Sequence, residues 1–242
     1  MSLPPRRAEA RTPSDEDWQP LRPRTLVDMV IGAIMAAAAR GLLLPGDRIV
    51  ESELGQKLGV SRVPIREALR ILESQGVVIN EPYKGIRLTP YTPERLDNLI
   101  EARVALETAA ACRSIRLGRN DARGIAMLEQ SIGELELMRA RNDAYGFANA
   151  DTGFHRMLLS LSGNDVLCEL WEGLARQVTI FFGLSTLDKS MAAIVDEHRA
   201  LIRAFRSGDP QAMARALDEH ISVQTHAVDY SGIITRRRAE RD

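Results

Sequence analysis

The 242-residue chain has few cysteines and few histidines, and its apolar runs are short. Its 2 cysteines, Cys112 and Cys168, lie far apart and form no CxxC pair. This spacing argues against a disulfide-stabilised secreted fold and favours reduced thiols in a cytoplasmic protein. No apolar run approaches the roughly 20 residues that span a bilayer, so we expect no membrane segment. The N-terminus also lacks the apolar stretch of a signal peptide.

A strong overall charge is also missing, because the formal net charge is −1. The total charge therefore does not indicate a nucleic-acid binder, and any DNA contact must come from a local cluster of basic residues. Hydrophobic residues make up 45% of the chain, which is enough for a packed core.

Composition and periodicity divide the chain into four segments. Residues 1–24 hold almost half of the 11 prolines and few large apolar residues, which predicts a flexible tail. We expect a winged helix-turn-helix domain of three helices and a small β-hairpin over residues 25–89. An all-α antiparallel helical bundle is predicted over 90–232, and a basic tail over 233–242. The fold class is therefore mainly α.

The segment 25–89 has the order of elements of a winged helix. Apolar residues at three- and four-residue spacing predict a helix over 25–40, and further helices are expected over 51–58 and 62–75. Gly59 supplies the conformational freedom that the turn between the last two helices needs. The β-like runs 77–79 and 86–88 predict the hairpin that forms the wing.

Arginines recur every four residues in the third of these helices, at Arg62, Arg66 and Arg70. This spacing places them near one face, where guanidinium groups can bond guanine O6 and N7 in the major groove. Lys84, in the wing, is positioned to reach phosphate or the minor groove. The competing interpretation is an ordinary solvent-exposed helix, which the surrounding helix-turn-helix and wing disfavour.

Several motifs here resemble the winged helix-turn-helix of the GntR family. They are LPGDRI at 44–49, ExEL at 51–54, LGVSRVPIREAL at 58–69 and KGIRL at 84–88. The resemblance implies DNA contact by Arg62 and Arg66, with Lys84 and Gly85 in the wing. We add Arg70, from its spacing, and Ser61, the predicted N-cap of the helix, to the expected DNA contacts.

The rest of the chain shows helical periodicity and no strand-like alternation. Helices are predicted near 93–117, 121–141, 144–162, 165–184, 188–207 and 210–230, separated by breaks rich in Gly, Asn and Pro. Such helices with short connections are typical of an antiparallel bundle.

Three of the 4 histidines fall into a pattern with one aspartate. Asp151 and His155 are four residues apart on one predicted helix, and His198 and His220 lie on two later helices. A bundle can bring these side chains together as an N/O site suited to Zn²⁺, Ni²⁺, Mn²⁺ or Fe²⁺, with zinc favoured. The alternative is that they are unrelated polar residues. His226 is excluded, because it is turned about 240° from His220.

The helical segment resembles the FCD domain, the C-terminal domain of FadR-type members of the GntR family. The matching motifs are DxxFHxxL at 151–158, SGN at 162–164 and EHxxLIxAF at 197–205. The resemblance implies that the Asp151, His155, His198 and His220 positions bind a metal and that a small organic acid binds there. Arg103 matches a position that faces the cavity, and Arg176 is a second candidate for contact with the acid. For Arg103, the alternative is a salt bridge to Glu107, four residues on, or to another helix, whereas Glu101, two residues away, cannot pair well with it.

These observations predict a homodimeric transcription regulator rather than an enzyme. We expect a repressor that binds a palindromic double-stranded operator and is controlled by a small carboxylate effector at the metal site. Two alternatives remain open at this point. The metal ion could itself be the effector, or the site could be that of a metal-dependent hydrolase, although no HExxH motif and no adjacent general base is evident.

Overall fold

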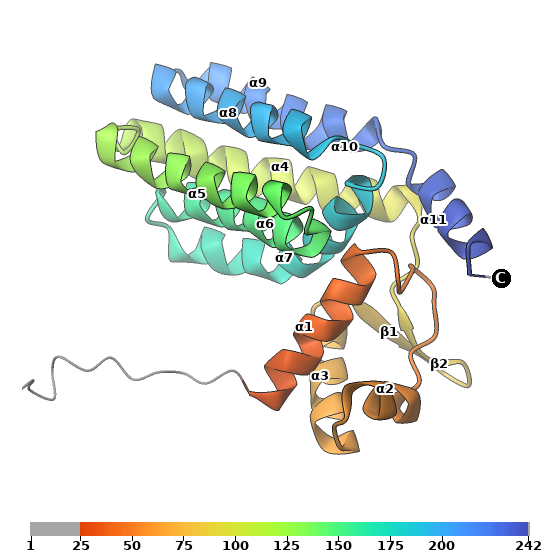
Figure 1. Ribbon diagram of the computed structural model, residues 1–242. Helices are drawn as coiled ribbons and strands as arrows, with labels where there is room; N and C mark the ends of the chain where they lie inside the picture. The colour runs from red at the N-terminus through yellow and green to blue at the C-terminus, as the bar shows by residue number, and fades with distance from the viewer. Residues whose placement is uncertain (1–24, 242) are drawn as a thin grey trace, which may run out of the picture.

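The computed structural model describes residues 25–241, so the predicted tail 1–24 lies outside the described residues. The chain forms a small winged-helix domain followed by a larger helical domain (Figure 1). The predicted fold class, mainly α with one small β-hairpin, is confirmed. Over the described range, no helix is long and apolar enough to cross a membrane.

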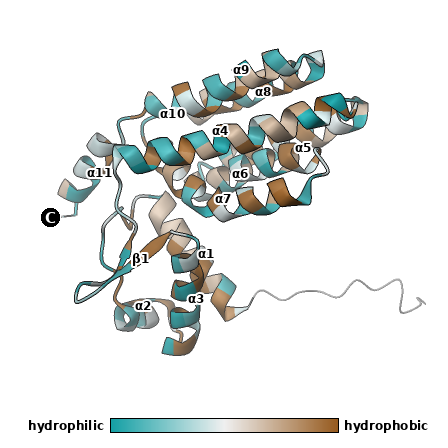
Figure 2. Ribbon diagram, turned by 180° about the vertical axis from the view of Figure 1, so that it is seen from behind, coloured by the Kyte–Doolittle hydropathy of each residue, from teal (hydrophilic) through white to brown (hydrophobic). Residues whose placement is uncertain are grey.

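The winged-helix domain has three helices and one two-stranded sheet. Its elements are α1 (Leu26–Ala39), α2 (Glu51–Leu58), α3 (Arg62–Ser74), β1 (Val78–Glu81) and β2 (Gly85–Leu88). The strands are antiparallel, with Val78 opposite Leu88. The start of β1 is hydrophobic and the hairpin tip is hydrophilic, as expected for a wing that projects into solvent (Figure 2).

Local sequence fixes the ends of these helices. Thr25 and Asp28 form a capping box at the start of α1. Gly59 ends α2 with φ 66°, a left-handed conformation that suits glycine, and so allows the sharp turn into α3. The inner face of α3 then packs Ile65, Leu69 and Leu72 into the core of this domain.

The helical domain begins with α4 (Pro93–Arg116), α5 (Ala122–Ala140), α6 (Ala144–Ser160), α7 (Asp165–Ser185) and α8 (Met191–Ser207). Short loops connect these helices, and α6 packs between α5 and α7, while α4 lies against α6 and α7 and α5 against α8 (Figure 1). Aromatic and leucine side chains fill the centre, among them the fully buried Phe147, Phe154, Leu158 and Phe205.

The end of the chain differs from the prediction of one helix over 210–230 and a tail over 233–242. The segment contains α9 (Pro210–Asp218), a π-helical turn η2 (Glu219–Val223), the short α10 (Gln224–His226) and α11 (Tyr230–Ala239). The prediction of a tail over 233–242 is therefore wrong for residues 233–239, which belong to α11. Asp229 caps α11, and the burial of Tyr230, Ile233 and Ile234 holds this helix against the rest of the molecule.

The two domains pack closely where α1 meets α7. Gly183 faces Ala39 so tightly that a Cβ at Gly183 would lie 2.5 Å from the Ala39 Cβ. Polar contacts add to this junction, because Gln177 donates to the Gln75 carbonyl at 2.9 Å and accepts from Arg95 at 2.7 Å. The winged helix is thus docked on the helical domain rather than merely linked to it.

Candidate metal centre and DNA-binding surface

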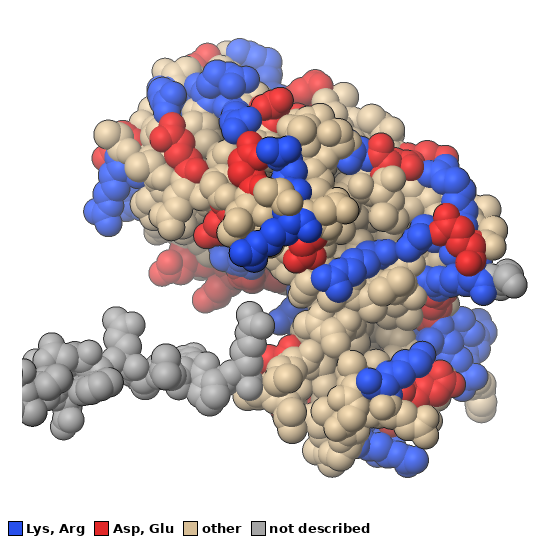
Figure 3. Space-filling view, viewed as in Figure 1, with Lys and Arg blue, Asp and Glu red and all other residues tan. Residues whose placement is uncertain are grey.

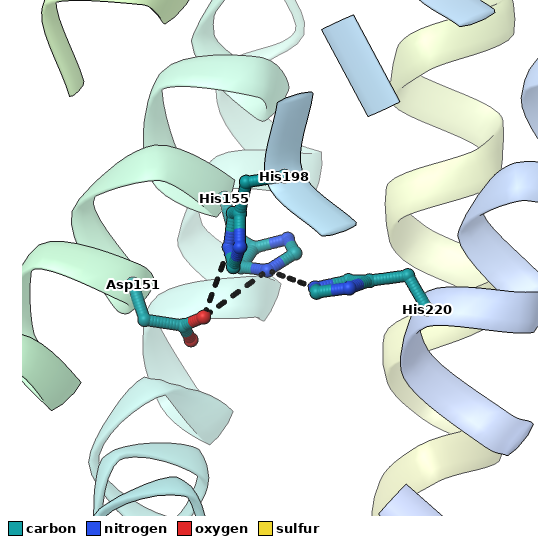
Figure 4. Close-up of side chains that lie close together, drawn as sticks. All are labelled: Asp151, His155, His198 and His220. Atoms are coloured by element: carbon teal, nitrogen blue, oxygen red, sulfur yellow. Dashed lines mark hydrogen bonds and ion pairs between the residues drawn. The ribbon is translucent and has the colours of Figure 1, made fainter. Parts of the chain in front are cut away.

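Four predicted metal ligands come together inside the helical domain. Asp151 and His155 lie on α6, His198 on α8 and His220 on the π-helical turn, and their side chains converge (Figure 4). One ligand atom from each lies within 4.8 Å of those of the other three. Asp151, His155 and His198 are fully buried, and the side chain of His220 is 8% exposed.

The outer nitrogen of each histidine faces an oxygen. The Nδ1–H of His198 donates to the Ile194 carbonyl at 2.8 Å, and that of His155 donates to Glu107 Oε2 at 2.5 Å. His220 Nδ1 lies 3.5 Å from Glu197 Oε2. The hydrogen bonds of His155 and His198 favour the tautomer in which the Nε2 lone pair is directed inward, as is usual for histidines that bind metal.

The inward-facing atoms lack donors of their own. Among the described residues, neither oxygen of Asp151 has a hydrogen-bond partner, and neither does His198 Nε2. Asp151 Oδ1 and His198 Nε2 are nevertheless only 3.0 Å apart, and His155 Nε2 and His220 Nε2 are 3.3 Å apart. Lone pairs held this close in a buried site repel unless a cation lies between them, so the residues present fit a metal ion.

The protonation states also suit metal binding. Burial, together with the neighbouring His198, lowers the pKa of His220 to about 3, so this imidazole is neutral at pH 7. Burial alone would raise the pKa of Asp151, but His198, His155 and Arg103 outweigh it and hold the pKa below its usual value. The site therefore offers one ionised carboxylate, from Asp151, and one neutral imidazole, from His220.

A buried polar layer behind the cluster orients His155. Glu107 on α4 accepts from His155, from Trp171 Nε1 at 2.9 Å and from Arg103 Nε at 3.0 Å. Burial opposes ionisation of Glu107, yet His155 and Arg103 lower its pKa. The i, i+4 spacing identified Glu107 as a possible partner of Arg103, but its contact with His155 joins distant helices and has no sequence signal.

A small cavity opens beside the cluster. Asp151, His220, Arg103 and Tyr230 contribute to its lining, together with apolar side chains of α4 and α7. The volume of the cavity, counted as the space that the centre of a water molecule can occupy, is about 40 Å³. The cavity therefore suits a small polar molecule next to the four ligands.

The predicted DNA contacts lie on the outer surface of the winged helix. Ser61, Arg62, Arg66 and Arg70 are exposed, whereas Ile65 and Leu69 on the other side of α3 are buried. Ser61 is the N-cap residue, but its side chain makes no capping hydrogen bond. Arg66 Nε lies 2.8 Å from Glu51 Oε2 and keeps 59% of its side chain exposed. In the view of Figure 3, a few separate basic side chains lie on the part of the winged-helix domain that is remote from the helical domain.

The wing carries Lys84 and Gly85 as predicted, and a third residue that the sequence analysis did not select. Lys84 is exposed and pairs with Glu81 at 3.0 Å. Tyr83, beside it, is fully exposed and has φ 66°, which is unusual for a non-glycine residue. The position of Tyr83 in the sequence, between Pro82 and Lys84 in the predicted turn, could have indicated an aromatic side chain that projects into solvent.

Comparison with known protein families agrees with both halves of the molecule. Residues 26–88 match the family described as bacterial regulatory proteins, gntR family, and residues 98–223 match the FCD domain. The chain belongs to the GntR family. Because this family and the relatives below are transcription regulators, the GntR chain is a DNA-binding transcription regulator and not an enzyme.

Two named relatives and one solved structure align with most of this GntR regulator. It is 29% identical to a Paenarthrobacter nicotinovorans protein named "Probable D-xylose utilization operon transcriptional repressor", over 86% of this chain and 90% of that protein. The gluconate operon transcriptional repressor of Bacillus licheniformis is 26% identical over 74% of this chain and 75% of its own length. The structure of E. coli McbR/YncC has the same fold, with a TM-score of 0.69 at 22% identity, covering 86% of this chain and 98% of that chain.

The two arginines predicted to bind effector have different positions in this GntR regulator. Arg103 lines the cavity and also forms the salt bridge to Glu107, while its Nη2 is buried without a partner among the described residues. Arg176 does not line the cavity; its guanidinium bonds the side chain of Gln75 at the domain junction. Its assignment to the effector site is therefore wrong, because that face of α7 is turned toward the winged helix.

The π-helical turn accounts for the position of His220. A π turn inserts one residue into a helix and so changes the direction of the side chains within it. His226, which the sequence analysis excluded from the ligand set, is half exposed and pairs with Asp97 at 2.9 Å.

Proposed function

We propose that this chain is a homodimeric repressor that binds a palindromic DNA operator through α3 and the wing. The exposed row of Arg62, Arg66 and Arg70 carries this proposal, because arginines on the outer face of such a helix suit the major groove. Two copies related by a two-fold axis would present two such helices to two half-sites. Two relatives are named as repressors, which favours repression over activation for this chain. A repressor meets its operator in the cytoplasm.

The second part of the proposal is that Asp151, His155, His198 and His220 hold one divalent metal ion, with zinc favoured over nickel, manganese or iron. The donor set and the partnerless buried atoms of Asp151 and His198 support this assignment. When bound, the ion supplies a fixed positive charge that attracts the oxygens of a small acid.

The third part is that the effector is a small carboxylate bound in the adjacent cavity. Arg103 would receive it, because its Nη2 is buried and has no partner within residues 25–241, whereas its Nε is held by Glu107. A guanidinium fixed at one nitrogen and free at another is well placed to pair with a carboxylate. The effector would then bind one arrangement of the dimer more tightly and so shift operator affinity.

A binding selection tests this function directly. Wild-type protein is used to select duplexes from a random DNA library, and native mass spectrometry of the same preparation identifies any retained metal and small acid. We expect a palindromic consensus, one divalent ion on each chain, and lower operator affinity when acid is added. If no sequence were enriched, the DNA-binding part would be wrong. If metal alone changed operator affinity, the ion itself would be the effector.

A further inference from the structure

The C-terminal helix α11 connects the cavity with the DNA-binding domain. In Figure 1 it lies at the junction of the two domains, beside the loop that follows α1. We propose that α11 is the coupling element of this regulator: Tyr230 at its start responds to the contents of the cavity, and Arg238 and Arg241 at its end hold the winged helix. The inference rests on the proposed control by a cavity ligand.

The end of α11 is fastened to one loop of the winged helix. Arg238 donates to the Pro45 carbonyl at 2.6 Å, and Arg241 donates to the Gly41 carbonyl at 2.7 Å and to Asp47 Oδ2 at 2.6 Å. These bonds cross about two hundred residues of sequence, so they join the last turns of the chain to the DNA-binding domain.

The bonded carbonyls of Gly41 and Pro45 lie in the loop that follows α1. Arg241 also forms an ion pair with Asp47 of the same loop, at 2.6 Å. The contact between α11 and this loop therefore includes an electrostatic attraction as well as hydrogen bonds.

The loop held by these arginines is part of the rigid body that contacts DNA. Gly46 donates to the Leu88 carbonyl, Leu88 donates to the Asp47 carbonyl, and Ile49 donates to the Ile86 carbonyl, all at 2.8 to 2.9 Å. Residues 46–49 thus run along β2 of the wing and lead directly into α2. Any shift of α11 that pulls on this loop must move the wing and the helix-turn-helix.

The other end of α11 reaches the cavity. Tyr230 lines the cavity and is 3% exposed. Its ring contacts Tyr91 of the interdomain linker, with ring centroids 5.9 Å apart, and Phe181 of α7, at 5.8 Å. A ligand that displaces the Tyr230 ring would therefore move the start of α11 and the linker together, which gives the relay a contiguous path of packed side chains.

Hydrogen–deuterium exchange of the full chain tests this coupling without an identified effector. The readout is the exchange rate of the backbone amides in residues 41–49. One variant removes the hold on the loop, Arg238→Ala with Arg241→Ala. Its matched control is Arg236→Ala, since Arg236 lies on the same helix but pairs with Asp188 inside the helical domain.

A second pair of variants tests the cavity end. Tyr230→Leu alters the cavity lining outside residues 41–49, and Phe205→Leu is the control for loss of a buried aromatic in the same domain. We expect the double arginine variant to raise the exchange rates of residues 41–49 about tenfold and Tyr230→Leu to raise them severalfold. Both controls should leave these rates near the wild-type values.

The proposal is overturned if the double arginine variant exchanges like wild type, or if Tyr230→Leu changes residues 41–49 no more than Phe205→Leu does. Metal content and operator binding of the same preparations report separately on the proposed function. Absence of metal or of specific DNA binding would refute that function, whereas unchanged exchange would refute only the role of α11.

Discussion

At the scale of single residues, the defining feature is a buried cluster of four candidate ligands, in which Asp151 and His198 Nε2 have no hydrogen-bond partner among the described residues. His198 shows this most clearly, because its Nδ1 is used by the Ile194 carbonyl and its Nε2 faces Asp151 at 3.0 Å. Removing one of these side chains should therefore remove the metal rather than merely loosen the core.

His198→Ala should lose nearly all bound metal and lower the melting temperature of the helical domain, because metal binding and folding are linked. Elemental analysis and thermal unfolding, each with and without a chelator, measure the two effects. The control is His226→Ala, which removes an exposed histidine outside the cluster. Metal retained at the wild-type level in the His198 variant would refute the ligand set.

Glu107→Gln tests the layer behind the ligands. Glutamine keeps the shape but not the charge that orients His155, so metal affinity should fall about 10- to 100-fold while all four ligands remain. Competition with a chromophoric chelator measures this affinity. Glu101→Gln, on the exposed side of α4, should bind metal like wild type. Equal affinities for the two variants would contradict the orienting role of Glu107.

At the scale of secondary-structure elements, α3 and the wing should contribute differently to DNA binding. Arg66→Ala should weaken operator binding by about 1–3 kcal/mol and weaken non-specific binding much less, because arginine reads base edges. Lys84→Ala should weaken both kinds of binding similarly and reduce the salt dependence, because we expect the wing lysine to contact phosphate. Fluorescence anisotropy at several salt concentrations separates these outcomes. Unchanged operator affinity of the Arg66 variant would contradict the orientation assigned to α3.

Two glycines of α7 allow a controlled test of the contact between α1 and α7, because Gly183 lies in this contact and Gly173 lies outside it. Gly183→Ala places a methyl group against Ala39 and should lower the free energy of unfolding by about 1–3 kcal/mol. Gly173→Ala, on the same helix with nothing within 4 Å of its Cβ position, should raise it by up to about 1 kcal/mol. Denaturant unfolding measures both. A Gly183 variant as stable as the Gly173 variant would show that the domains do not dock through this contact.

Much of the element order was predictable from local patterns. Gly59, the arginine spacing of α3 and the Asp151–His155 spacing are all short-range signals, and the structure contains the corresponding turn, helix face and ligand pair. The π turn around His220 and the separate helix α11 were not predictable. They depend on burial of Tyr230 and Ile233 against distant helices, which leaves no local pattern. The prediction that Arg176 contacts the effector failed for the same reason. Periodicity does not show which face of α7 meets the winged helix, and Arg176 lies on that face.

At the scale of the whole molecule, the candidate ligand site and the DNA-binding surface belong to different domains that share one junction. The α1–α7 contact, the linker residue Tyr91 and α11 all meet there. In the proposed dimer, a change in the cavity would therefore alter how the two winged helices are presented to the two half-sites of the proposed operator.

The most direct test of this account is the operator affinity of metal-loaded protein in the presence and absence of small carboxylates. We expect at least one acid to change the wild-type affinity about fivefold or more, the usual range of coupling between two sites. Arg103→Gln should lose that response while keeping its affinity without acid. An affinity that stays constant across the acids, or a response that persists in the Arg103 variant, would contradict control through this cavity.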